Sequence, residues 1–209
     1  MTASIQSSLF DDATDHATIG PLAGRVRRRM LSDGAWIDIC PGWISGSATL
    51  FDALHEQVPW RAERRRMYDR VVDVPRLVAI YDEHATLPDP LLNDARAALS
   101  RHYVDELPER FATAGLCLYR DGSDSVAWHG DRIGRGSTHD TMVAIVSLGS
   151  PRPLMLRPRG GGPSVKITAG PGDLVVMGGS CQRTWEHAIP KATGVGARIS
   201  IQFRPLGVW

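Results

Sequence analysis

Eight short apolar or alternating runs fill the second half of this chain, and they constrain its fold more than any other feature. Each run is bounded by Gly, Pro, Asp or Ser, the residues that favour turns. The runs are GLCLYR (115–120), SVAWHGD (125–131), DTMVAIVSLG (140–149), RPLMLRP (152–158), SVKIT (164–168), DLVVMGG (173–179), TWEHAIP (184–190) and ARISIQFRP (197–205). No helical pattern lies between them, so a parallel sheet with crossover helices fits poorly. The spacing predicts a β-sandwich, barrel or jelly roll.

The first half of the chain has a mixed pattern. Residues 1–20 are small and polar and predict a loose tail. The segment 35–44 is strand-like, whereas 50–60 and 87–104 have the apolar spacing of helices. We expect His102 to lie on the buried stripe of the second helix as a packing residue. The pattern predicts a single α+β, mainly β domain over 21–209, with a front layer at 21–113 and a β-rich core at 114–209.

Composition limits the class of protein and its setting. Hydrophobic residues make up 43% of the chain and charged residues 22%, which excludes disorder over the whole length. The sequence has no apolar run of transmembrane length, and its first residues include acids but no Lys or Arg, unlike a secretory signal. Cys40, Cys117 and Cys181 are too sparse for a disulfide framework or a cysteine zinc site. We expect a cytoplasmic monomer with no membrane partner.

His129-Gly-Asp131 is the motif with the most specific chemical meaning. Residues i and i+2 of a strand face the same side, so an imidazole and a carboxylate can reach one point. A distant histidine would complete a 2-His-1-carboxylate facial triad, which is typical of non-haem Fe(II) oxygenases. The tripeptide alone is a weak signal, but His187 follows 58 residues later among the predicted strands.

The last predicted strand carries two arginines on one face. The two-residue period of a strand puts Arg198, Ser200, Gln202 and Arg204 on the same side. A buried charge without a partner is costly, so inward-facing arginines beside a metal site predict an anionic ligand inside the barrel. A dicarboxylate that chelates the metal is the natural candidate.

In order and spacing, His129-x-Asp131, His187 and Arg198 to Arg204 resemble the Fe(II)/2-oxoglutarate-dependent dioxygenases of the AlkB type. The likeness spans about residues 60 to 205. It includes LYRDG (118–122), IVSLG (145–149), GDLVVMGG (172–179) and VPRLVAIYDE (74–83). The resemblance implies a double-stranded β-helix, or jelly-roll, core with N-terminal helices and a strand-rich nucleotide-recognition layer.

The resemblance also implies a role for each site residue. The two histidines and the aspartate would be the catalytic residues that hold Fe(II), and Arg198 would bind the distal carboxylate of 2-oxoglutarate. Tyr119 would donate a hydrogen bond to this cosubstrate, and Arg204 would complete the anion site. Cys117 and Ser200 stand where the family often has Asn, so they belong to the cosubstrate site with altered contacts. With O2, the reaction would yield succinate, CO2 and a hydroxylated N-alkyl group that leaves as an aldehyde.

The partner that the resemblance implies is nucleic acid, either alkylated DNA or alkylated RNA. Arginines beside an aromatic residue can hold phosphates while the aromatic ring stacks on a base. Many relatives carry acidic residues after the metal Asp, but this chain has Arg132-Ile133-Gly134-Arg135, so a cationic base would need another partner. The residues expected to contact the substrate are Arg64, Arg65, Arg66, Met67, Tyr68 and Tyr81.

Two other functions remain open from the sequence. The same iron chemistry would also suit a protein side chain or a small metabolite. A third possibility is a nucleic-acid-binding module with a vestigial metal site. The intact triad and both arginines argue against this last function, because a site that no longer binds metal would be expected to lose some of these five residues by mutation.

Overall fold

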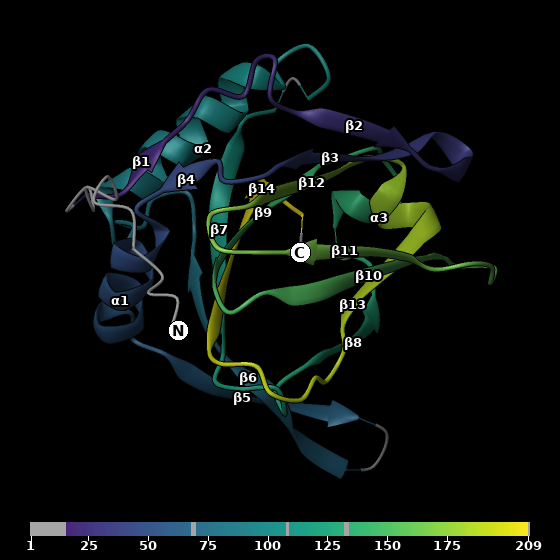
Figure 1. Ribbon diagram of the computed structural model, residues 1–209. Coiled ribbons are helices and arrows are strands. Elements are labelled where there is room, and N and C mark those ends of the chain that lie inside the picture. The colour runs from purple at the N-terminus through teal and green to yellow at the C-terminus, as the bar shows by residue number, and fades with distance from the viewer. Residues whose placement is uncertain (1–15, 68–69, 108, 132–133, 209) are drawn as a thin grey trace, which may run out of the picture.

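Two antiparallel sheets face each other across the centre of the protein in a computed structural model that describes residues 16–67, 70–107, 109–131 and 134–208 (Figure 1). In spatial order, the larger sheet contains β2 (Arg27–Met30), β3 (Ala35–Cys40), β12 (Leu174–Gly179), β9 (Val143–Gly149), β14 (Arg198–Pro205), β7 (Phe111–Tyr119), β6 (Arg70–Tyr81) and β5 (Arg61–Met67). The smaller sheet contains β11 (Val165–Ala169), β10 (Arg152–Pro158), β13 (Trp185–Ile189) and β8 (Val126–His129). This arrangement confirms the predicted jelly-roll core.

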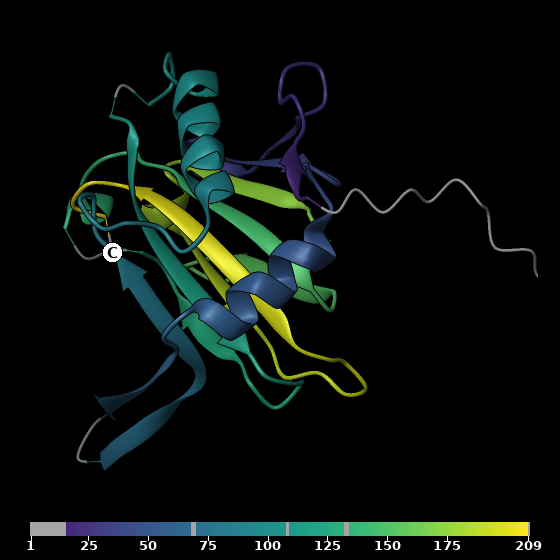
Figure 2. The same ribbon diagram turned by 90° about the vertical axis from the view of Figure 1, so that its left-hand side faces the viewer.

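Strands from the first half of the chain join the same large sheet. β3 pairs with β12, and β6 pairs with β7, so β2, β3, β5 and β6 extend the sheet on both sides. The short strands β1 (Thr18–Ile19) and β4 (Ile44–Ser45) form a separate pair. The hairpin of β5 and β6 projects from the body of the molecule, as Figure 2 shows.

Two helices cover the outer face of the large sheet (Figure 2). Helix α1 (Ser47–Gln57) buries Leu50 and Leu54, and α2 (Pro90–His102) buries Leu92, Ala95 and Leu99. The Asp89 carboxylate caps α2 by accepting a hydrogen bond from the Leu91 amide at 2.8 Å. The third helix, α3 (Cys181–Thr184), is a single turn. None of the helices in the described part of the chain has the length and apolar character needed to span a bilayer.

The prediction for His102 is wrong. Its side chain is exposed, and the buried position one residue later belongs to Tyr103. Helix α2 ends at His102, and Tyr103 lies four residues after Leu99, on the same side of the helix. The Tyr103 hydroxyl donates a hydrogen bond to the buried Asp38 carboxylate at 3.0 Å, which satisfies both groups.

Strand β14 lies between the apolar core under the helices and the space between the two sheets. Ile199, Ile201 and Phe203 are fully buried against the helices. The alternate residues, from Arg198 to Arg204, point between the two sheets and line the central hollow. Because successive side chains of a strand face opposite sides, one strand supplies both an apolar core and a polar site.

Candidate active site

His129, Asp131 and His187 lie together at the centre of the barrel. His129 ends β8, Asp131 follows two residues later, and the antiparallel pairing of β8 with β13 sets His187 directly opposite His129. The two imidazole centroids are 4.2 Å apart, and the ligand atoms of the three residues all lie within 4.8 Å of one another. Two imidazoles and one carboxylate, with the remaining directions open, are the donor set that suits Fe(II).

The electrostatics of this cluster favour metal binding. Burial acts to raise the pKa of Asp131, but the Arg204 guanidinium and the two imidazoles outweigh it and lower this pKa to about 2. Burial, followed by the charge of His129, lowers the pKa of His187 to about 3. Near neutral pH the carboxylate is therefore ionised and the His187 imidazole is neutral, which are the forms that bind a metal.

Neighbouring groups hold the metal-site residues in place. The Nδ1 atom of His129 lies 2.9 Å from the Ala127 carbonyl oxygen. A carbonyl can only accept, so Nδ1 carries the proton and Nε2 presents its lone pair to the cluster. The Gln182 side-chain oxygen accepts a hydrogen bond from the Asp131 amide at 3.1 Å. Sequence reasoning missed Gln182, because nothing in its surroundings on the chain marks it as part of a metal site.

A hollow with both polar and apolar lining residues lies against the metal cluster between the two sheets. We call it the inner hollow, and its lining includes Cys117, Tyr119, His129, His187, Arg198 and Ser200. Arg198 is 1% exposed, and its Nε donates to the Ser147 hydroxyl at 2.9 Å. Its Nη1 is buried without a hydrogen-bond partner. A buried guanidinium with an unused donor fits an anionic ligand, as the sequence predicts.

The other residues predicted for the cosubstrate site also border the inner hollow, but some contacts differ from expectation. Arg204 does not face the hollow as a free anion ligand, because its Nε donates to Asp131 Oδ2 at 2.7 Å. The Ser200 hydroxyl accepts a hydrogen bond from the side-chain amide nitrogen Nε2 of Gln202 at 2.5 Å. Cys117 Sγ lies 3.4 Å from the Nε of Arg76, which donates to it. The sequence analysis assigned no role to Arg76 or Gln202, although Gln202 shares the predicted face of β14.

A second hollow also borders the metal cluster, and we call it the outer hollow. Its lining includes Glu63, Val78, Ile80, Gly115, His129 and Asp131, and it offers about 270 Å³ of space. Tyr81, which the resemblance places at a base pocket, is not among the described residues that line this hollow. Tyr81 packs with the core under the helices, and its neighbour Ile80 faces the hollow instead. Successive side chains of β6 alternate in direction, so only one of the two can face the site.

Four of the six residues predicted to contact the substrate belong to β5. Arg64, Arg65, Arg66 and Met67 lie in β5, but their side chains are not described. Tyr68, Arg132 and Ile133 lie outside the described residues.

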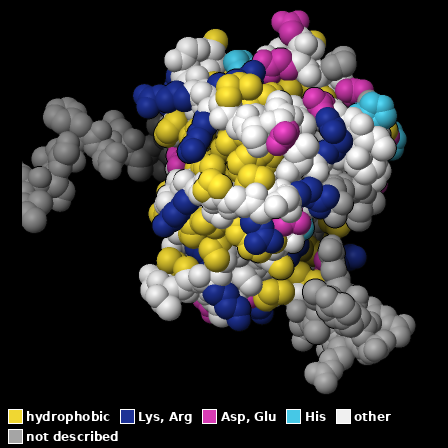
Figure 3. All heavy atoms as spheres, turned by 90° about the vertical axis from the view of Figure 1, so that its right-hand side faces the viewer, with side chains coloured by type: hydrophobic (Ala, Val, Ile, Leu, Met, Phe, Trp, Pro, Cys, Tyr) yellow, Lys and Arg dark blue, Asp and Glu magenta, His cyan; other side chains and the backbone are white. Residues whose placement is uncertain are grey.

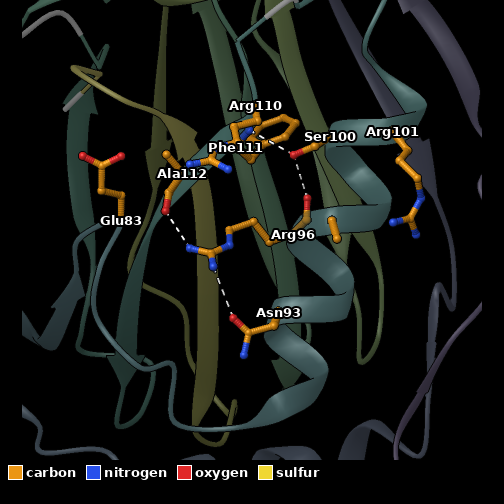
Figure 4. Close-up of a pocket in the computed structure, with 9 residues that line it drawn as sticks. Glu83, Asn93, Arg96, Ser100, Arg101, Arg110, Phe111 and Ala112 are labelled. Carbon is orange, nitrogen blue, oxygen red and sulfur yellow. Dashed lines mark hydrogen bonds between the residues drawn. The ribbon is translucent and has the colours of Figure 1, made fainter.

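A separate hollow lies between α2 and the start of β7 (Figure 4). Its lining includes Arg96, Arg101 and Arg110. The Arg96 guanidinium donates to the Ala112 carbonyl at 2.7 Å and to the Asn93 side-chain oxygen at 3.2 Å. Figure 4 shows Arg101 pointing away from these groups. Because the arginines do not converge on one point, we attribute this hollow to the seam between helix and sheet.

Comparison with known proteins identifies relatives. The profile of the 2OG-Fe(II) oxygenase superfamily matches residues 39–204. The alpha-ketoglutarate-dependent dioxygenase alkB homolog 3 of Bos taurus is 29% identical over 188 residues, covering 79% of this chain and 64% of that protein. The DNA oxidative demethylase ALKBH2 of Arabidopsis thaliana is 29% identical over 199 residues, covering 76% and 62%. The chain therefore spans somewhat less than two thirds of the length of these relatives.

Solved structures share the fold. The structure of OsALKBH1 superposes with a TM-score of 0.58 at 13% identity, over 86% of this chain and 100% of that chain. An oxidoreductase of the 2OG-Fe(II) oxygenase family from Burkholderia pseudomallei gives a TM-score of 0.56 at 14% identity, over 80% and 84%. With the profile match over most of its length, the chain belongs to the 2OG-Fe(II) oxygenase superfamily, within which it resembles the AlkB-type members.

Proposed function

We propose that this protein is an Fe(II)- and 2-oxoglutarate-dependent dioxygenase that removes alkyl groups from the nitrogen atoms of nucleobases in DNA or RNA. The observation that supports it most is the position of Arg198 relative to the metal cluster. Arg198, whose Nη1 is buried without a hydrogen-bond partner, lines the same inner hollow as His129 and His187. A cosubstrate that chelates iron at one end and carries a carboxylate at the other requires such an arrangement.

The protein residues would bind and orient the cosubstrate. Arg198 would pair with its distal carboxylate, while Ser147 keeps the guanidinium in position through Nε. Burial and the neighbouring Cys117 raise the pKa of Tyr119 to about 12, so its hydroxyl keeps its proton and can donate a hydrogen bond. Val143, Ile145 and other apolar side chains form the remaining wall and exclude water.

Iron, 2-oxoglutarate and O2 would together supply the oxidising chemistry, which yields succinate and CO2 and hydroxylates the N-alkyl carbon so that an aldehyde leaves. Asp131 and the two histidines would hold the metal between the two hollows. The cosubstrate would occupy the inner hollow, and the alkyl group would enter from the outer hollow. Arg204, which borders both hollows, would keep the metal carboxylate ionised and oriented.

A nucleobase is the substrate that we favour for the outer hollow. Enzymes that modify a base take it out of the stack into a pocket, and the apolar Val78 and Ile80 suit the face of a planar ring. Figure 3 shows Lys and Arg side chains spread over the face formed by the small sheet, among hydrophobic ones. Basic residues at such a surface, together with Arg64, Arg65 and Arg66 on β5, would bind the phosphate backbone.

The test of this function is a product analysis. The protein is incubated with Fe(II), 2-oxoglutarate and oligonucleotides that carry one N-methylated base, and the products are weighed. We expect the oligonucleotide to lose the mass of one methylene group while formaldehyde and succinate accumulate in equal amounts. Succinate formation that responds to a peptide pool or to small metabolites, with every methylated oligonucleotide unchanged, would contradict the nucleobase substrate and favour the alternative hydroxylase.

A further inference from the structure

A fully buried arginine outside the metal site begins strand β10. Arg152 is 0% exposed, and its guanidinium donates hydrogen bonds to the backbone carbonyls of Asp121, Asp124 and Pro190 at 3.0, 2.9 and 2.8 Å. Its Nε is buried without a hydrogen-bond partner. Because burial of a guanidinium is costly, this charge calls for a negative partner.

The three carbonyls belong to segments that carry the site. Asp121 and Asp124 lie between β7, which ends at Tyr119, and β8. Pro190 directly follows β13. These three strands supply Tyr119 and both histidines of the metal cluster. The hydrogen bonds of Arg152 therefore fix the segments around the inner hollow, and a side chain could do this without using its charge.

The neighbouring carboxylates leave the charge of Arg152 only partly balanced. The Asp124 carboxylate pairs instead with Arg120, whose Nη2 lies 2.8 Å from Oδ1. The exposed Asp121 carboxylate accepts a hydrogen bond from the Ser123 hydroxyl at 2.6 Å. Burial lowers the pKa of Arg152, and the nearby acidic groups oppose this effect without reversing it.

Two buried arginines approach the same aromatic ring. The Cζ atom of Arg152 lies 5.6 Å from the ring centroid of Tyr119, and that of Arg198 lies 5.2 Å from it. Tyr119 and Arg198 line the inner hollow, whereas Arg152 is not among its described lining residues. Burial lowers the pKa of Arg198, and the positive charge of Arg152 lowers it further. An anion with more than one negative charge would be stabilised by both guanidinium groups.

We propose that Arg152 is a positioning residue whose buried charge, beside Tyr119 and Arg198, strengthens the binding of doubly negative 2-oxoglutarate. This inference rests on the cosubstrate part of the proposed function and is independent of the nucleobase. Arg198 would pair with the distal carboxylate, and Arg204 already pairs with Asp131. Arg152 supplies a further positive charge without touching the cosubstrate.

The test separates the charge of Arg152 from its hydrogen bonds. Arg152→Lys keeps the charge but loses the planar fork that reaches three carbonyls, whereas Arg152→Gln loses both. Binding of 2-oxoglutarate is measured with Fe(II) and without oxygen, and unfolding in urea is measured in parallel. Both variants should be destabilised. Arg152→Gln should bind 2-oxoglutarate about tenfold more weakly, and Arg152→Lys should stay within about threefold of the unaltered protein.

Steady-state kinetics give a second readout. The KM for 2-oxoglutarate should rise about tenfold in Arg152→Gln, while kcat and Fe(II) affinity stay within about twofold. Arg157→Gln is the matched control, because it removes an arginine of the same strand that lies over Trp128. This control should leave 2-oxoglutarate binding unchanged.

A variant with the opposite sign keeps Arg152 in place and tests the same charge if Arg152→Gln does not fold. Asp124→Asn removes a buried negative charge near Arg152 and leaves the backbone carbonyl that accepts its hydrogen bond. The inner hollow should become more positive, so 2-oxoglutarate should bind about twofold more tightly or better. A purely structural role of Arg152 predicts no such gain.

The outcomes separate this inference from the function on which it rests. Equal weakening of 2-oxoglutarate binding in Arg152→Gln and Arg152→Lys, or no gain in Asp124→Asn, would overturn the role of the charge and leave the dioxygenase intact. Failure of the unaltered protein to bind 2-oxoglutarate would overturn the proposed function and this inference with it.

Discussion

The Nε of Arg204 donates a hydrogen bond to Oδ2 of Asp131 at 2.7 Å, and the ion pair is nearly buried. This contact connects the last strand of the barrel to the metal cluster. It gives Arg204 a different position from the one that the sequence suggested, because the guanidinium supports a metal-site carboxylate as well as bordering the cosubstrate hollow. Partners of this kind orient metal-binding groups and raise metal affinity.

Replacement of Arg204 should therefore weaken iron binding. Burial raises the pKa of Asp131 and the positive charge of Arg204 lowers it. Without this charge the pKa of Asp131 should rise in Arg204→Gln. We expect Fe(II) affinity to fall by about 10- to 100-fold, with a larger loss at pH 5.5 than at pH 7.5. Anaerobic iron titrations at both pH values measure this. Arg157→Gln, on the outer face above Trp128, is the control. Equal affinity in both variants would contradict the role of Arg204.

Replacement of Arg198 should affect the cosubstrate rather than the metal. Its buried guanidinium is the candidate partner of the distal carboxylate, and loss of one partner of a buried charge pair costs about 2–5 kcal/mol. Arg198→Ala should raise the KM for 2-oxoglutarate by about two orders of magnitude or more, with Fe(II) affinity little changed. Steady-state succinate formation at varied 2-oxoglutarate measures the effect. An unchanged KM would mean that another residue holds the carboxylate.

The metal-free protein should lose stability in mild acid because of His187. The pKa of this residue is about 3 in the folded chain, against 6.5 for an ordinary histidine. Between pH 7.5 and pH 5.5 the unfolded chain gains a proton here and the folded chain does not, so stability falls as pH falls, by about 1 kcal/mol. Urea denaturation with a chelator present, compared with His187→Gln, isolates this contribution. An identical pH dependence in the two proteins would refute it.

The basic cluster on β5 should govern the salt dependence of nucleic-acid binding. If Arg64, Arg65 and Arg66 neutralise phosphates, each lost contact should reduce the slope of log affinity against log salt by about one. Replacing all three with Gln should flatten this slope without changing succinate formation in the absence of substrate. Tyr68→Ala should instead weaken binding by about 1–3 kcal/mol at every salt concentration, as expected for loss of a stacked base. Salt-independent binding in the unaltered protein would contradict this account.

Much of the site can be predicted from the two-residue period of the strands, but the rest depends on how neighbouring strands align. The two-residue period predicts that His129 and Asp131 share a side, but the pairing of His129 with His187 depends on how β8 and β13 align. A similar limit applies to Tyr81, which is not among the described residues that line the outer hollow. A shift of one residue reverses which side chains of a strand face the site, and the bulge near Pro75 lies upstream of this position.

Other parts of the site have no local signal at all. Gln182 lies in a single helical turn and reaches Asp131 across 51 positions of sequence. Glu63 lies in a run of basic residues, so the sequence alone indicates an exposed, solvated side chain. In the structure Glu63 lines the outer hollow. His102 shows the opposite limit, because the apolar spacing of α2 continues through it but the helix ends there.

We propose that His129, Asp131 and His187 hold the iron that activates 2-oxoglutarate. The amount of succinate formed per chain from Fe(II) and 2-oxoglutarate, in the unaltered protein and in Asp131→Ala, tests this role. This substitution removes the charged member of the cluster, whose ligand atoms lie within 4.8 Å of one another. The unaltered protein should form succinate, and Asp131→Ala should form none above the protein-free background. Full succinate formation by Asp131→Ala would contradict the assignment.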